Sequence, residues 1–97
     1  LFSWKNFRRI MFYKRSDQVK VKKIGSDTAL YVSDPKGIHV LNETALFIWE
    51  ALRDPFTFDE LLYMLHETFK GNADQMKADL NEILDIFLRH HLVCKEK

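Results

Sequence analysis

Residues 38–52 read IHVLNETALFIWEAL, and the spacing of the apolar side chains changes within this stretch. Residues 38–41 form a short apolar run that is typical of a strand. Asn42 is a suitable helix N-cap, and the apolar residues after it recur at helical intervals, at Ala45, Ile48, Trp49 and Leu52. The stretch therefore predicts a strand that leads directly into a helix, and the helix must end near the proline at position 55.

Two further β-rich runs precede this stretch, at residues 19–24 and 28–32, with the turn residues GSD between them. Residues 33–37 read SDPKG, which fits a type I turn with Asp34, Pro35 and Gly37 at its first, second and fourth positions. Three short strands joined by short turns predict an antiparallel meander.

Two more helices are expected after the first. Residues 57–60 read TFDE, a capping box in which Thr57 and Glu60 satisfy each other's backbone amides, and Gly71 is a plausible end for that helix. A third helix begins near residues 72–74 and carries the stripe of a core-facing helix, at Met76, Leu80, Ile83, Leu84, Phe87 and Leu88. The predicted fold is α+β and winged-helix-like, a three-stranded antiparallel sheet followed by three helices.

Length and composition limit the protein to one domain. The 97 residues are 46% hydrophobic, which is ordinary for a folded domain. The single cysteine, Cys94, excludes an intramolecular disulfide and makes the cytoplasm the simplest location. The longest apolar runs, residues 45–49 and 61–65, are too short for a membrane span, and no signal peptide is recognised.

Charge is distributed unevenly along the chain. Residues 1–25 hold eight basic side chains against one acidic, whereas the remainder holds seven against thirteen. Aromatic and basic residues alternate near the start, and Trp4, Phe7 and Met11 recur at helical intervals. Two interpretations stay open: a basic amphipathic helix for lipid, nucleic acid or a partner, or a helix or strand packed on its own domain. We divide the chain into a basic aromatic segment, residues 1–18, and a domain, residues 19–97.

Residues for catalysis are few. His90, His91 and Cys94 fall short of the four ligands of a structural zinc site, and Gly25, Gly37 and Gly71 are isolated at turns rather than gathered in a phosphate loop. The carboxylates mostly fall on helix faces away from the apolar stripes. We therefore predict a protein that is not an enzyme and that needs no metal or cofactor.

Two modes of binding are physically available. A helix that enters DNA should present basic or amide side chains, but the second and third helices present carboxylates, which argues against nucleic acid. A winged-helix DNA-binding regulatory protein that uses the basic strand and tail is the alternative hypothesis. In the favoured mode, residues 38–41 form an exposed sheet edge, and a peptide adds to it as another strand beside Ile83, Leu84 and Phe87.

Three blocks of the sequence resemble the PqqD family, the recognition domains for ribosomally made and post-translationally modified peptides. Residues 38–52 contain the pattern Leu-Asn-x-x-Ala-x-x-Ile-Trp, residues 56–61 read FTFDEL, and residues 79–93 form a helix that closes on Leu92-Val93. The order and spacing of the blocks agree with the family over about residues 19–94. Where the family usually has glycine before the last valine, this chain has His91-Leu92.

The resemblance implies a non-catalytic peptide chaperone. Family members bind the leader segment of a precursor peptide as an extra strand between the third strand and the third helix. They present it to a modifying enzyme, often a radical SAM enzyme, as in PQQ biosynthesis, or to a protease or cyclase in lasso-peptide pathways. The basic aromatic N-terminus lies outside the match and leaves three roles open: docking to the partner enzyme, linkage to a fused domain, or completion of a homodimer.

The resemblance also assigns the binding residues. On the third strand they are Lys36, Gly37, Ile38, His39, Val40 and Leu41, and on the facing helix Leu80, Ile83, Leu84 and Phe87. Lys77, at the edge of that helix, is expected to meet an acidic side chain of the leader.

Overall fold

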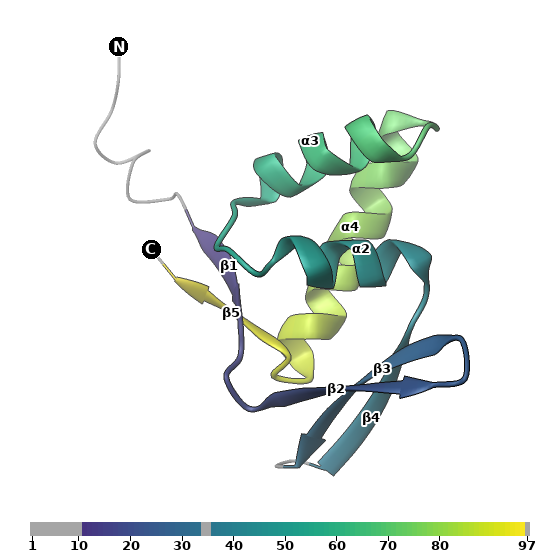
Figure 1. Cartoon of the computed structure of the whole chain (residues 1–97). Coiled ribbons are helices and arrows are strands. Elements are labelled where there is room, and N and C mark those ends of the chain that lie inside the picture. Colours follow the sequence, from purple (N-terminus) through teal and green to yellow (C-terminus); the bar gives the residue numbers. More distant parts are fainter. Residues whose placement is uncertain (1–10, 34–35, 97) are drawn as a thin grey trace.

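The computed structural model describes residues 11–33 and 36–96 (Figure 1). In chain order the elements of this part are β1 (Phe12–Arg15), β2 (Val19–Ile24), β3 (Asp27–Ser33), β4 (Lys36–Leu41), α2 (Glu43–Ala51), α3 (Phe58–Thr68), α4 (Ala73–Arg89) and β5 (Val93–Glu96). The three helices form one group, and the sheet made of β2, β3 and β4 lies across one end of it (Figure 1). The α+β fold with a three-stranded antiparallel sheet and three helices is confirmed.

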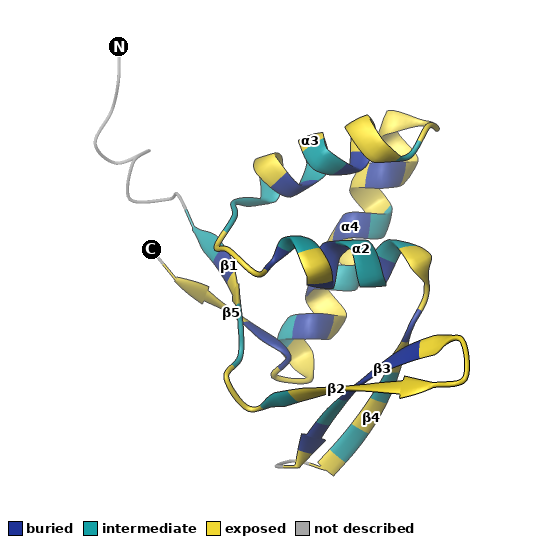
Figure 2. Cartoon of the chain, in the orientation of Figure 1, coloured by how far each residue is buried: buried dark blue, intermediate teal, exposed yellow. Residues whose placement is uncertain are grey.

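The three-stranded sheet has the order β2-β3-β4, and both pairings are antiparallel. Successive side chains of a strand point to opposite faces, so Thr28, Leu30 and Val32 share one face of β3, and all three are buried. The opposite face carries exposed lysines on β2 and exposed valine and isoleucine on β4. Figure 2 shows most of β2 as exposed. The turn predicted at residues 33–37 includes residues 34–35, which lie outside the described residues.

Each helix begins at the polar residue that the sequence predicts. The Asn42 side chain accepts a hydrogen bond from the Ala45 amide at 2.8 Å, and the capping box of Thr57 and Glu60 is formed in both directions. Asn72 caps α4. The end of α3 differs from the expectation at Gly71, because Phe69 already adopts an extended conformation and places its ring edge-on to Phe47, 5.4 Å away.

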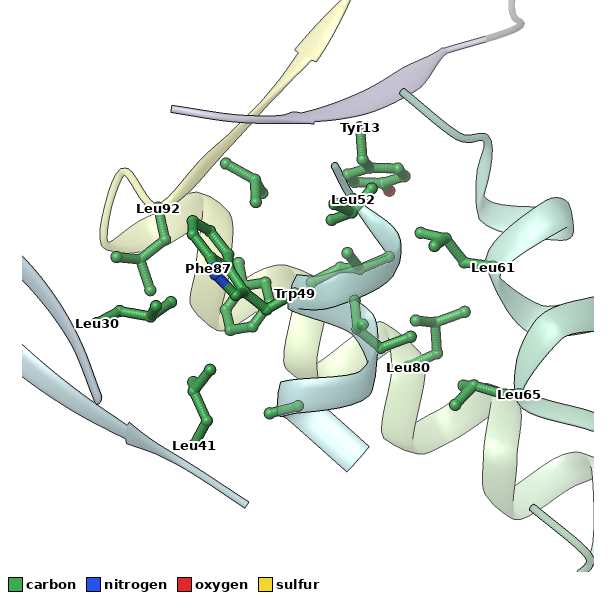
Figure 3. Close-up of a cluster of buried hydrophobic side chains, with 14 of the residues drawn as sticks. Tyr13, Leu30, Leu41, Trp49, Leu52, Leu61, Leu65, Leu80, Phe87 and Leu92 are labelled. Carbon is green, nitrogen blue, oxygen red and sulfur yellow. The ribbon is translucent and has the colours of Figure 1, made fainter. Parts of the chain in front are cut away.

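The core is formed where the sheet and the three helices meet (Figure 3). Trp49 from α2 and Phe87 from α4 stack edge to face with ring centroids 6.2 Å apart, a favoured geometry for aromatic pairs. The same core cluster contains leucines from β3, from the three helices and from the turn after α4: Leu30, Leu52, Leu61, Leu65, Leu80 and Leu92. The core therefore joins β3 to all three helices.

A second, two-stranded sheet joins β1 to β5, and the sequence analysis did not predict it as a sheet. Tyr13 is buried in the core, and its amide donates a hydrogen bond to the Phe56 carbonyl at 2.8 Å. The Arg15 guanidinium lies 4.3 Å from the centre of the Trp49 ring, and its Nε donates to the Trp49 carbonyl at 2.9 Å. Residues 12–15 of the basic aromatic segment 1–18 are therefore a strand packed on the domain, while Trp4 and Phe7 lie outside the described residues.

Candidate binding groove

β4 is an edge of the three-stranded sheet. It pairs with β3 over its whole length, from Ser33 opposite Lys36 to Thr28 opposite Leu41. Among the described residues, no strand pairs with its other side. The outward-pointing amides and carbonyls of β4 are therefore available to another extended chain.

A groove of about 380 Å³ lies between β4 and α4, and we call it the β4–α4 groove. Its lining comes from β4, from the start of α2, from α4 and from the turn after α4: Ile38, His39, Val40, Leu41, Asn42, Ala45, Ile83, Ile86, Phe87 and Leu92. Most of these side chains are apolar. The groove thus places an open strand edge beside apolar helix side chains.

The structure brings together six of the predicted site residues in this lining: Ile38, His39, Val40, Leu41, Ile83 and Phe87. Lys36 and Gly37 belong to β4 but lie outside the lining. Leu80 and Leu84 are 0% and 2% exposed, and they belong to the core rather than to the lining. Lys77 is exposed and stands six residues before Ile83, a spacing that puts the two on different sides of α4.

Four lining residues were not among the predicted site residues: Asn42, Ala45, Ile86 and Leu92. From the sequence, Asn42 was expected to cap a helix and Ala45 to lie in the core. The place of Ile86 in the lining could have been predicted, because Ile86 follows Ile83 by three residues and therefore lies on the same side of the helix. Leu92 follows the end of α4 and enters the groove through a chain reversal, which no hydrophobic period reveals.

The two faces of β4 differ. Ile38 and Val40 point to the outer face of the sheet and are 56% and 60% exposed, whereas His39 and Leu41 point toward the helices. Opposite Ile38 on β3 is Tyr31, also on the outer face. A chain added along β4 would therefore have apolar neighbours on both of its sides.

Two histidines meet at the end of the groove. The ring of His39 on β4 lies 4.5 Å from the ring of His90, the C-cap of α4, centre to centre. Burial lowers the pKa of His39 below its ordinary value, and the neighbouring His90 lowers it further. Gly37 leaves room for this arrangement, because a Cβ atom at position 37 would lie 3.2 Å from Nε2 of His39.

Other kinds of site are not formed in the part of the chain that the structure describes. No group of three or more His, Cys, Asp or Glu side chains there is placed to hold a metal ion. None of the described helices combines the length and the apolar character that crossing a membrane requires. The exposed surface of α3 and α4 carries carboxylates, at Asp59, Glu60, Glu67, Asp74, Glu82 and Asp85.

Comparison with known proteins gives one family and two solved structures. The sequence model of the family described as coenzyme PQQ synthesis protein D (PqqD) matches residues 29–93. Among curated proteins, none matches this chain.

The first similar structure is TbiB1 in complex with the TbiA(beta) leader peptide, with a TM-score of 0.71 and 19% identity, covering 82% of this chain and 93% of that one. The second is a lasso peptide synthetase B1 complexed with the leader peptide, with a TM-score of 0.71 and 13% identity, covering 84% of this chain and 96% of that one. At these identities the likeness establishes a shared fold.

Proposed function

The chain belongs to the PqqD family, and on that basis we propose that it binds the leader segment of a ribosomally made precursor peptide and presents it to a modifying enzyme. The observation that carries this proposal is the open edge of β4 beside the apolar β4–α4 groove. Main-chain hydrogen bonds to β4 would supply affinity, and the groove would select side chains. The two similar structures are themselves complexes with leader peptides, which supports this choice of guest.

The role we propose is one of binding without catalysis, in the cytoplasm. The partner would be an enzyme that modifies the bound precursor, either a radical SAM enzyme or a protease or cyclase of a lasso-peptide pathway. The acidic surface of α3 and α4 and the outer face of the sheet remain free for such a partner when a guest occupies the groove.

Ile86 provides the first test, with the leader peptide of the neighbouring precursor gene as the probe. Ile86 lines the groove and is 37% exposed, so Ile86→Lys places a charge where the guest must pack without disturbing the core. We expect the dissociation constant, measured by fluorescence anisotropy, to rise by about 30-fold or more, the effect of a central contact in an interface. The matched control is Tyr63→Lys on α3, which is 66% exposed and lies outside the groove. Equal binding by the two variants would exclude this groove.

Proline substitutions test the added strand directly. Along an edge strand the amides point alternately to the paired strand and to the open side, so of His39 and Val40 one amide faces β3 and the other faces outward. Proline removes the amide hydrogen. We expect one of His39→Pro and Val40→Pro to abolish leader binding with the fold retained by circular dichroism, and the other to unfold the sheet. A folded proline variant with normal affinity at both positions would contradict strand addition.

The DNA-binding alternative is tested in the same titration. Neutralising several phosphates makes the affinity for duplex DNA fall steeply with salt. Because carboxylates cover the exposed surface of α3 and α4, we expect no saturable, salt-dependent binding to duplex DNA.

A further inference from the structure

The histidine pair gives the groove a chemical preference that neither the family nor the fold assigns. We propose that His39 and His90 form a subsite for a carboxylate side chain, aspartate or glutamate, of the guest peptide. This inference rests on the proposed function, since it concerns a residue of the same guest.

The direction of the groove follows from its contacts. His39 meets His90, whereas Asn42 and Ala45 line the groove together with Ile83, so β4 and α4 run in opposite directions. Spacings of four, three and four residues place Asp79, Ile83, Ile86 and His90 along one side of α4. This side of the helix thus passes from Asp79, which is outside the groove lining, through Ile83 and Ile86, which line the groove, to His90, which contacts His39. An acidic guest residue is disfavoured at the Asp79 end and favoured at the histidine end.

In the part of the chain that the structure describes, neither His39 nor His90 forms an ion pair with a carboxylate. Opposite His39 on β3 is Leu30, and on β4 itself Lys36 points to the outer face of the sheet. On α4 the titratable group that faces His39 is His90, and the neighbouring Arg89 is paired with Asp85. His91, after the helix, is exposed. Within residues 11–33 and 36–96 no carboxylate forms an ion pair with either histidine, and we take the guest as its source.

The burial of His39 explains why a carboxylate fits better than a neutral group. Burial and the neighbouring imidazole lower the pKa of His39, so His39 resists protonation when the groove is empty. An acidic side chain within hydrogen-bonding distance raises an imidazole pKa and gains a charge-assisted hydrogen bond. Binding of an acidic guest is therefore coupled to proton uptake, and its affinity rises as the pH falls from 7.5 to 6.0.

A random library tests this chemistry without knowledge of the natural leader. Phage-displayed peptides of about twelve residues, long enough to cover a strand of ordinary length, are selected against the immobilised protein at pH 6.0. We expect peptides with two or more apolar residues and an aspartate or glutamate at a constant distance from them. The selected peptide and its Asp→Asn or Glu→Gln counterpart are then titrated at pH 6.0 and 7.5. The acidic peptide should bind about tenfold more tightly at pH 6.0 than at pH 7.5, the change expected when its carboxylate raises the pKa of the imidazole by about one unit. The affinity of the amide counterpart should not rise.

Variants of the protein separate the outcomes. His39→Gln and His90→Gln should remove the pH dependence, while the matched control His66→Gln, an exposed residue of α3, should keep it. If the selected peptides bind the wild type but not the Ile86→Lys variant, and show no preference for an acidic residue, the carboxylate subsite is wrong and the proposed function still stands. If no selected peptide loses its binding in the Ile86→Lys variant, both the carboxylate subsite and the proposed function are wrong.

Discussion

At the scale of single residues, His91 carries the turn that closes α4. It adopts a left-handed conformation with φ of 60°, which favours glycine over residues that have a Cβ atom. The Leu92 amide donates to the Phe87 carbonyl at 2.8 Å and the His91 amide donates to the Leu88 carbonyl at 3.2 Å, which together form a Schellman motif. The chain thus keeps the turn with a residue that has a Cβ atom.

His91→Gly should therefore stabilise the protein by about 1 kcal/mol, since a left-handed conformation strains any residue other than glycine. The measurement is the free energy of unfolding in urea. His66→Gly is the matched control: inside the last turn of α3 the same change should destabilise the protein by up to about 1 kcal/mol. A loss of stability from His91→Gly would show that the imidazole makes a compensating contact.

His39 makes stability depend on pH. Its pKa is lowered in the folded protein, chiefly by burial and then by His90, so the unfolded chain binds a proton near pH 6.5 and the folded chain only at lower pH. The stabilisation is complete above about pH 6.5 and is lost as the pH falls through the folded pKa. Between pH 7.5 and 5.5 the wild type should lose more unfolding free energy than His39→Gln. Equal losses in parallel urea titrations would contradict this.

At the scale of elements, the helix starts depend on local contacts that can be tested one at a time. The Thr57 hydroxyl accepts from the Glu60 amide at 3.2 Å, and the Glu60 carboxylate accepts from the Thr57 amide at 2.9 Å. Thr57→Ala should lower the free energy of unfolding by about 1 kcal/mol. Thr68→Ala at the other end of α3, where the residue is exposed, should change it by less than about 0.5 kcal/mol. If the two changes are equal, the capping box is not what stabilises this helix start.

The elements that the sequence predicts are those encoded by neighbouring residues. The caps at Asn42 and Thr57 and the short turn between β2 and β3 use contacts within a few positions, and all three helices and β2, β3 and β4 were predicted from such local patterns. The strands β1 and β5 are different, because they pair residues about eighty positions apart, such as Phe12 with Glu96. Neither strand has a hydrophobic period of its own, so only the tertiary structure reveals them.

The groove was predictable to a similar extent. The β4 side of the groove was predicted from the position of the strand in the chain, and Ile83 from the helical period of α4. The sequence alone does not say which part of the apolar stripe of α4 faces β4. Leu80 and Leu84 are buried in the core, and Ile86 lies beside Ile83 in the groove lining. The contact between His39 and His90 joins residues 51 positions apart and therefore has no local signal in the sequence.

At the scale of the whole molecule, the two sheets are linked through the groove. The Ser16 amide, at the end of β1, donates a hydrogen bond to the carbonyl of Leu92 at 3.0 Å, and Leu92 lines the β4–α4 groove. Tyr13 of the same strand is buried, and Arg15 holds the end of α2 through the Trp49 carbonyl. The small sheet therefore supports one wall of the binding groove.

Removal of β1 should weaken both stability and binding. A chain that starts at residue 19 lacks the Tyr13 side chain, and loss of a buried aromatic residue lowers the free energy of unfolding by about 3 kcal/mol or more. It also leaves β5 unpaired and Leu92 without its bond to Ser16, so the leader should bind more weakly even where the chain is still folded. The control chain starts at residue 11 and keeps β1. Lys14→Ala, at an exposed position of the same strand, should behave like the wild type, whereas Tyr13→Ala should reproduce most of the loss. Equal stability and leader affinity in chains starting at residues 11 and 19 would show that the groove stands independently of the small sheet.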